Sequence, residues 1–497
     1  MNIYRESFFD ILEQHAAHRG NKTAIYYFRE KITYSKLLEQ INRLGNILKT
    51  LGIKRKERLV IALPDCPDTV YAFLGAIKIG AIPVLISPDL KEDTCKFILY
   101  DCDASAVITS NNTEISRVKS GSLRFKLYID DSYYNELIKN SSCESEVSPE
   151  KDINFLLYSS GSTGSPKGVP HRLSDINFIA ETYGTQTLNM TDRDITFSAG
   201  KLFFAYGLGN SLAFPFITGG STVLFPDKPE PFEVMRIISE YKPTIFFGVP
   251  TLYNMMIKAM GKNFTFPSLR FCVSAGETLP AGIYHEWKEI TGLEIIDGLG
   301  TTETMHIVIS NRQGNVRPGS SGFPVPGYEV KITGEDGNTV PSGTAGHLLI
   351  KGNSNAPFYW NRPYKTKETM LPDGWLKTGD IYIEEHGCYT YQGRIDDMFK
   401  VNANWISPAQ VEQVMKEHPS VTDCGVTWRK LEELVKPVAY AVLREGFNGD
   451  LNLVKDIRNF ILKKLPDYMC PAQIIFTEEI PRTETGKVQR FKMRKEN

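Results

Sequence analysis

The spacing of apolar residues predicts a chain that alternates strands and helices. Between residues 34 and 51, leucine and isoleucine recur every three or four positions, which is the period of one helix face. Apolar runs at 58–63 and 81–87 read as strands on either side of a helical stretch at 68–79. Strand, helix and strand in this order form a βαβ unit, so the pattern predicts the start of a parallel sheet.

Later segments continue this alternation. Strands are expected at 104–109, 125–129, 153–157, 269–274 and 293–296, and 244–253 reads as a strand that passes into a helix. From about residue 397 a smaller α+β unit is expected, with helices at 408–418 and 453–465, a strand at 435–443 and a closing loop. A chain of 497 residues is too long for one ordinary core, so an α/β protein of at least two domains is predicted.

Composition narrows the class of partner. Lysine plus arginine number 57 and aspartate plus glutamate 58, a balance that argues against a general nucleic-acid or membrane-surface binder and favours a small-molecule partner. The eight cysteines include no C-x-x-C pair, so neither a zinc site nor a disulfide framework is indicated. No basic-then-apolar leader, no apolar run of about 20 residues and no terminal Ser-Lys-Leu is present. A cytoplasmic protein without a membrane span is expected.

The stretch 158–169 reads Tyr-Ser-Ser-Gly-Ser-Thr-Gly-Ser-Pro-Lys-Gly-Val and carries the first candidate chemistry. Its glycines interrupt the preceding strand, so a tight loop leaving a sheet is expected. Glycine lets backbone N–H groups approach an anion, while hydroxyl groups and a lysine add donors and positive charge, which predicts a phosphate cradle. The candidate residues are Ser159, Ser160, Gly161, Ser162, Thr163, Gly164 and Lys167. The spacing is not that of the common P-loop, and a flexible loop without a ligand is the alternative.

The ordered pattern Ser-Gly-Ser-Thr-Gly-x-Pro-Lys-Gly resembles the signature of the acyl-adenylate-forming superfamily, which includes acyl-CoA synthetases, peptide-synthetase adenylation domains and luciferases. Further segments match that superfamily in the same order. The segment at 203–210, Phe-Phe-Ala-Tyr-Gly-Leu-Gly-Asn, is particularly similar to benzoate-CoA ligases, although aromatic residues beside glycines are also typical of ordinary packing.

The resemblance implies an ATP site and an acyl pocket. Contacts to ATP or AMP are expected from Ala275, Gly276, Glu277, Asp297, Gly298, Leu299, Thr302, Asp380 and Arg394, and the two last residues would bind the ribose. Leu299 stands where most relatives have an aromatic residue, so apolar contact with adenine replaces stacking. The acyl pocket would comprise Ala205, Tyr206, Gly209, Ser274, Gly300 and His306. Tyr206 and His306 either receive a polar substituent or wall an apolar slot, and an ordinary buried histidine is the alternative for His306.

The resemblance also assigns catalytic and mobile parts. Catalytic roles fall to Lys487, Glu303, Thr302 and Lys167, and the Glu303 carboxylate would hold Mg²⁺. Asp396 occupies the hinge position between an N-terminal domain of stacked βαβ sheets at 1–394 and a small mobile α+β domain at 395–497. Asn402 and Ala403 fall in the thiol tunnel, where the Cβ of Ala403 replaces the hydrogen of a more usual glycine.

The expected activity is ATP-dependent conversion of a benzoate-like or other compact acid to acyl-AMP, with release of pyrophosphate and transfer to CoA. A freestanding adenylating enzyme that loads the phosphopantetheine of a separate carrier protein is the first alternative. A luciferase-like oxidoreductase and a silent nucleotide-binding module are further ones. A monomer or homodimer is expected, and the acid itself is left open by the sequence.

Overall fold

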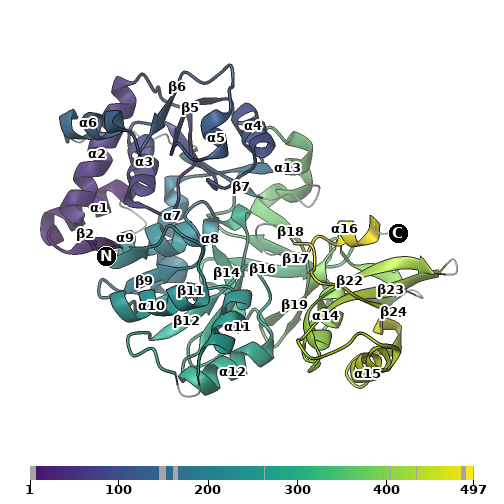
Figure 1. Cartoon of the computed structure of the whole chain (residues 1–497). Coiled ribbons are helices and arrows are strands. Elements are labelled where there is room, and N and C mark those ends of the chain that lie inside the picture. The colour runs from purple at the N-terminus through teal and green to yellow at the C-terminus, as the bar shows by residue number, and fades with distance from the viewer. Residues whose placement is uncertain are drawn as a thin grey trace.

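The computed structural model describes residues 7–144, 153–159, 166–261, 264–395, 397–401, 404–431, 434–482 and 488–495. A large N-terminal part and a smaller C-terminal part are visible, the latter in yellow and light green at one side of the molecule in Figure 1. The expected α/β class with a smaller second unit is confirmed. No helix in these segments has the length and apolar character needed to cross a bilayer.

The larger mixed sheet of the N-terminal part has the strand order β15-β14-β13-β12-β11-β9-β10-β1-β2. Its strands are β1 (Thr23–Tyr27), β2 (Glu30–Thr33), β9 (Ile195–Ser198), β10 (Ser221–Leu224), β11 (Ile245–Gly248), β12 (Phe271–Ser274), β13 (Ile295–Gly300), β14 (Ile307–Ser310) and β15 (Phe323–Pro324). Neighbours from β1 to β13 pair in parallel, whereas β13 pairs with β14 in antiparallel register. The expected strand at 293–296 therefore continues as far as Gly300.

The second sheet has the order β6-β5-β3-β4-β7-β8. Its strands are β3 (Arg58–Ile61), β4 (Ile82–Leu85), β5 (Ala104–Thr109), β6 (Phe125–Tyr128), β7 (Phe155–Ser159) and β8 (Lys167–His171). β3 and β4 are parallel neighbours joined through α3 (Pro67–Lys78), as the βαβ pattern predicted.

Helices cover both faces of these sheets. They are α1 (Phe8–Arg19), α2 (Tyr34–Thr50), α4 (Glu92–Asp101), α5 (Glu114–Arg117), α6 (Ser132–Asn140), α7 (Leu173–Ile179), α8 (Ala205–Leu208), α9 (Phe214–Thr218), α10 (Pro231–Tyr241), α11 (Pro250–Ala259), α12 (Ala281–Thr291) and α13 (Pro363–Thr369), with η2 (Ala180–Thr185), η3 (Gly209–Ala213), η4 (Thr302–Thr304) and η5 (Pro372–Gly374).

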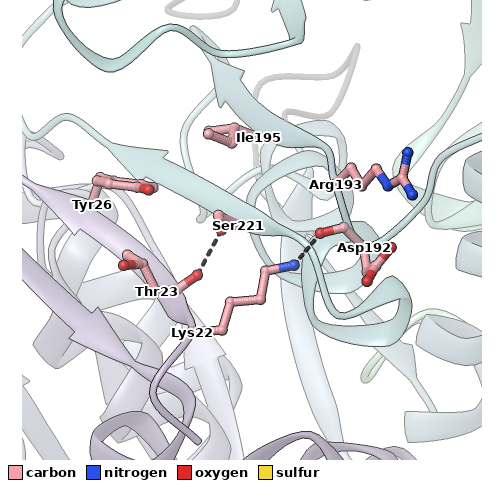
Figure 2. A pocket seen from close by; sticks show the side chains of 7 residues that line it. All are labelled: Lys22, Thr23, Tyr26, Asp192, Arg193, Ile195 and Ser221. Atoms are coloured by element: carbon pink, nitrogen blue, oxygen red, sulfur yellow. Dashed lines mark hydrogen bonds between the residues drawn. The ribbon is translucent and has the colours of Figure 1, made fainter. Parts of the chain in front are cut away.

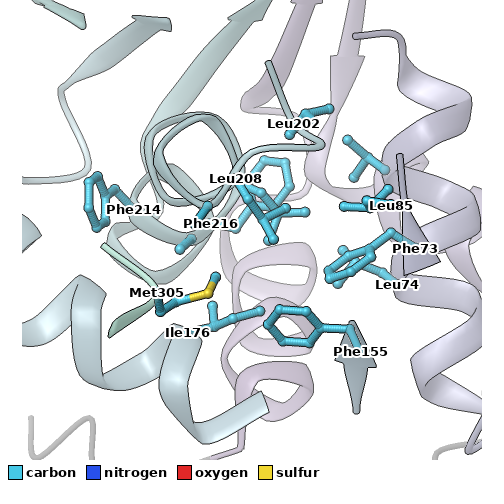
Figure 3. Close-up of a cluster of buried hydrophobic side chains, with 14 of the residues drawn as sticks. Phe73, Leu74, Leu85, Phe155, Ile176, Leu202, Leu208, Phe214, Phe216 and Met305 are labelled. Carbon is cyan, nitrogen blue, oxygen red and sulfur yellow. The ribbon is translucent and has the colours of Figure 1, made fainter. Parts of the chain in front are cut away.

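The main core lies between the two sheets. Along β11, Ile245 and Phe247 belong to this core while Phe246 belongs to the core on the opposite face, as expected for a sheet that is buried on both sides. Figure 3 shows Phe73 of α3 and Phe155 of β7 meeting Ile176, Leu208 and other side chains from the helices of the larger sheet. The two sheets therefore share one hydrophobic layer, which holds their strand ends in a fixed relation.

A third sheet, β16 (Glu329–Thr333), β17 (Gly346–Lys351), β18 (Trp375–Glu385) and β19 (Cys388–Arg394), leads into the C-terminal part. That part contains β20 (Phe399–Val401), β21 (Asn404–Ile406), α14 (Pro408–Lys416), β22 (Val421–Leu431), β23 (Leu434–Leu443), α15 (Leu451–Leu462), η6 (Asp467–Met469), β24 (Gln473–Phe476) and α16 (Arg490–Lys495). The expectation of a closing loop was wrong, because β24 pairs with β23 and α16 packs near the chain end.

Candidate active site

The phosphate stretch is a β-hairpin in its described part. Ser159 ends β7 and is paired with Lys167, which begins β8 in antiparallel register. The end of the stretch, residues 167–169, therefore belongs to a strand that the sequence did not predict, whereas the expected tight loop falls on residues 160–165, outside the described part of the chain. The amino group of Lys167 lies 4.8 Å from the ring centroid of Tyr359. Ser160, Gly161, Ser162, Thr163 and Gly164 lie outside the described residues.

Glu303 lies in the short η4 turn, near Lys167 of β8. Its Oε1 accepts a hydrogen bond of 2.6 Å from the Tyr359 hydroxyl. Burial would raise the pKa of Glu303, but the Tyr359 hydrogen bond and the charge of Lys167 outweigh it, so that pKa lies below its ordinary value. Glu303 is therefore an ionised carboxylate at neutral pH. Its charge suits it to hold a hard cation such as Mg²⁺ together with phosphate oxygens.

The turn at 302–306 is held from two other elements. Nε2 of the buried His171 donates to the Thr302 carbonyl over 2.8 Å, and its Nδ1 lies 3.1 Å from Asp175 Oδ2. On the other side, the amide of Ala356 donates to the Glu303 carbonyl and the hydroxyl of Ser354 to the Thr304 carbonyl, each at 2.8 Å. β8 thus begins with Lys167 and ends with a histidine that supports the Glu303 turn.

The expected adenine segment lies at the carboxyl ends of β12 and β13, where parallel α/β sheets place ligands. Ala275, Gly276 and Glu277 follow β12 directly, and Ser274 is the register partner of Asp297 on β13. Gly276 has φ of +89°, and Glu277 accepts a hydrogen bond of 2.8 Å from Thr251. Burial raises the pKa of Asp297 to about 8, against the opposing effect of the Ser274 hydroxyl and two main-chain N–H groups.

Gly298, Leu299 and Gly300 complete β13 rather than forming a loop. Leu299 is the register partner of Ile309 on β14 and packs against the main core. A Cβ at Gly300 would lie 2.5 Å from the carbonyl oxygen of His306, so only glycine allows β13 to approach the turn this closely.

The two residues expected to bind the ribose lie side by side on two neighbouring strands. Asp380 on β18 is the register partner of Arg394 on β19, and Arg394 Nε lies 3.5 Å from Asp380 Oδ1. Arg394 also donates to the Thr378 carbonyl over 3.1 Å. Burial and the neighbouring Glu303 raise the pKa of Tyr359, and the charge of Arg394 opposes that rise.

Two of the expected acyl-pocket residues, Tyr206 and Gly209, lie against the ring of a third, His306, which is neutral. Burial lowers the pKa of His306 to about 3. The amide of Asn210 donates to Ser198, so its Oδ1 accepts from His306 Nε2 at 3.0 Å. The hydroxyl of Tyr206 donates to the main-chain carbonyls of residues 248 and 273 at 3.2 and 3.3 Å. The hydrogen-bond donors of both side chains are thus engaged within the protein.

Gly209 and three aromatic rings fix the position of His306. The ring of His306 lies 5.2, 5.5 and 4.7 Å from those of Tyr183, Tyr206 and Phe214. A Cβ at Gly209 would lie 2.2 Å from His306 Cδ2. Ala205 is buried in α8, immediately before Tyr206. The sequence did not identify Tyr183, Phe214 or Tyr359, because none of them lies in a recognisable motif, and it did not single out Asn210 within the segment at 203–210.

The remaining predicted residues, Asp396, Asn402, Ala403 and Lys487, lie outside the described residues. An open surface hollow of about 250 Å³ contains none of the predicted site residues (Figure 2). Lys22 in that hollow donates to the main-chain carbonyls of Asp192 and Gly219, and Ser221 donates to Thr23 over 2.6 Å. Its polar groups thus bind one another and hold β1 against β10.

Two family models match the chain: the AMP-binding enzyme at residues 12–360 and the AMP-binding enzyme C-terminal domain at 410–487. A benzoate–CoA ligase of Thauera aromatica is 39% identical, over 96% of this chain and 93% of that protein. A p-hydroxybenzoic acid–AMP ligase of Mycobacterium marinum is 32% identical over 94% of this chain and 66% of that protein.

Two solved structures of aryl-acid CoA ligases have the same fold as this chain. An anthranilate CoA ligase in complex with anthranoyl-AMP superposes with a TM-score of 0.92 and 38% identity, over 98% of this chain and 96% of that one. A benzoate CoA ligase from Burkholderia xenovorans LB400 gives a TM-score of 0.91 and 35% identity, over 99% and 100% of the two chains. The resemblance of the ordered motifs is thereby confirmed, and the chain belongs to the AMP-binding enzyme family.

Proposed function

We propose that the protein activates benzoate or another compact aryl acid and transfers the acyl group to CoA. The reaction class is that of an ATP-dependent, AMP-forming acid–CoA ligase, in agreement with the family and with two relatives, a benzoate–CoA ligase of 39% identity and a 4-hydroxybenzoate–CoA/benzoate–CoA ligase of 34% identity. The acid is inferred from the wall formed by Tyr206 and His306. Their hydrogen-bond donors are engaged within the protein, so an unsubstituted aromatic ring fits this wall best.

The first half-reaction joins two anions. The substrate carboxylate attacks the α-phosphorus of ATP, a P–O bond forms, and the bond to pyrophosphate breaks. Lys167 and Lys487 would offset the repulsion, while Asp380 and Arg394 would hold the ribose. Glu303, ionised and oriented by Tyr359, would hold Mg²⁺, which neutralises charge on the phosphate oxygens when bound.

In the second half-reaction the CoA thiol attacks the acyl carbonyl and AMP leaves. The domain at 395–497 would rotate about Asp396, so that Lys487 withdraws and the segment with Asn402 and Ala403 lines the path of the thiol. The domain at 1–394 would keep the adenylate in place between the two steps.

A pyrophosphate-exchange screen with ATP and Mg²⁺ tests the proposed substrate. Benzoate is expected to give the highest kcat/KM, and hydroxy- and aminobenzoates lower values, because a polar substituent against this wall would lose its water partners. Absence of exchange with every aryl acid would refute the proposal. A hydroxybenzoate preferred over benzoate would refute the apolar-wall argument and would point to His306 Nδ1, which is buried without a partner among the described residues, as its acceptor.

A freestanding enzyme that loads a carrier protein is the second candidate, favoured by the likeness to a p-hydroxybenzoic acid–AMP ligase. The two candidates differ in the acceptor. Formation of benzoyl-CoA from free CoA supports the ligase, whereas acylation restricted to a holo-carrier protein supports the alternative.

A further inference from the structure

We infer that Arg490 is a positioning residue that binds the hinge to the segment carrying the catalytic lysine. This inference rests on the proposed function, in which the C-terminal domain turns about Asp396 and Lys487 serves the first half-reaction. Arg490 follows Lys487 by three positions, and its partner Asp397 directly follows Asp396.

The guanidinium group of Arg490 joins three elements. Its Nη1 lies 2.8 Å from Asp397 Oδ2, and its Nη2 lies 2.7 and 2.8 Å from the two carboxylate oxygens of Glu412 on α14. Its Nε donates to the Val426 carbonyl of β22 over 3.0 Å. The side chains of Arg490 and Glu412 are each 10% exposed. This forked geometry is specific to arginine and fixes direction as well as distance.

The N-terminal side of the hinge is bound to the other domain. The amide of Ile395 donates to the Gly379 carbonyl over 3.0 Å, directly beside Asp380. Position 396 thus lies between a residue anchored on β18 and a residue anchored by Arg490. The amides of Asp397 and Met398 donate to the Arg394 carbonyl, each at 3.0 Å, so these two bonds cross the hinge.

Because residues 395 and 397 are both anchored, rotation of the C-terminal domain is confined to the few backbone torsions between them. This anchorage also makes the segment that follows Lys487 turn with residue 397 as one body. Without the Arg490–Asp397 contact, the lysine would approach the α-phosphate less reproducibly, and a misplacement of about 1 Å can cost about 10²-fold in rate.

Asp397→Asn in the full-length enzyme tests this role, because it removes the charge at the hinge and leaves the Arg490–Glu412 pair to support the fold. We expect kcat for benzoate-dependent pyrophosphate exchange to fall roughly 10- to 100-fold. The KM values for ATP and benzoate should change less than about twofold, since their sites lie in the other domain. Transfer from preformed benzoyl-AMP to CoA should change less than about threefold, because Lys487 takes no part in it.

Glu417→Gln is the matched control, because it also removes one carboxylate charge from an ion pair of the same domain, the exposed pair Glu417–Lys464. Its kinetics should equal those of the wild type. Asp397→Glu, which keeps the charge, should recover part of the lost rate.

Three results would overturn the inference: an exchange rate within twofold of the wild type, an equal loss of both half-reactions, or a lowered Tm that accounts for the lost activity. A wild-type enzyme without aryl-acid-dependent exchange would overturn the proposed function itself, a result separate from any effect of the variant.

Discussion

Tyr359→Phe removes one oxygen atom beside Glu303 and little else. The phenyl ring of the variant keeps the shape of the side chain and still faces the Lys167 ammonium. In the wild type, Lys167 Nζ lies 4.8 Å from the centroid of the Tyr359 ring. The hydrogen bond of 2.6 Å to Glu303 Oε1 is lost. The variant therefore isolates the contribution of a single charged hydrogen bond.

The size of the effect follows from that bond. A hydrogen bond to a charged group contributes about 1.5–3 kcal/mol, and about 1.4 kcal/mol corresponds to a factor of ten in rate. We expect kcat/KM for pyrophosphate exchange to fall roughly 10- to 150-fold. The pKa of Glu303 is held below its ordinary value in part by Tyr359, so its carboxylate persists to lower pH than usual. Loss of the donor raises that pKa, and the acidic limb of the pH–rate profile should move to higher pH.

The assay is ATP–pyrophosphate exchange with benzoate from about pH 3 to about pH 8, because the acidic limb set by Glu303 lies below the ordinary pKa of a glutamate. Transfer from preformed benzoyl-AMP, which should change little, is measured in parallel. Tyr134→Phe is the control, since Tyr134 also donates to a carboxylate, that of Asp68, remote from the site. An exchange rate within twofold of the wild type, with an unmoved acidic limb, would refute the role given to Tyr359.

Three further predictions concern other parts of the molecule. Gly209→Ala should raise the KM for benzoate and leave that for ATP unchanged, because the new Cβ would lie 2.2 Å from His306 Cδ2; equal KM values for benzoate would contradict it. Lys487→Ala should abolish pyrophosphate exchange and spare acyl transfer to CoA, and equal loss of both steps would contradict the division of roles. Burial raises the pKa of Asp65 to about 6, so the folded state loses stability as pH rises above the ordinary pKa. Asp65→Asn should therefore raise Tm at about pH 8 but not at about pH 4, which calorimetry can measure.

The sequence predicted those parts of the site that lie in contiguous motifs. Lys167, Glu303, Asp380 and Arg394 were found because each stands at a fixed place in a short ordered pattern. Tyr359 could not be found in this way, since it acts through a contact across the fold and stands between Phe358 and Trp360, an aromatic run typical of packing.

The pattern of apolar and polar residues also failed to predict two elements, β8 and α16, for physical reasons. β8 contains Gly168 and Pro170, which disfavour a strand, but it lies at the edge of its sheet, where proline is tolerated. α16 has six residues and little periodicity, and its first residue is bound by Asp397 and Glu412 from elsewhere in the chain. The strands and helices predicted for the βαβ region agree with the structure to within a few residues, because apolar periodicity there matches burial on both faces of the sheets.

The turn from 302 to 306 carries Glu303 near one end and His306 at the other. Between them Met305 adopts φ of +69° and is fully buried, so this short segment has little freedom to relax. In the proposed function, an acid that fits badly against His306 would therefore also displace the peptide that bears Glu303. The same short segment would then couple the choice of acid to cleavage of the nucleotide, and an ill-fitting acid would lose both affinity and turnover.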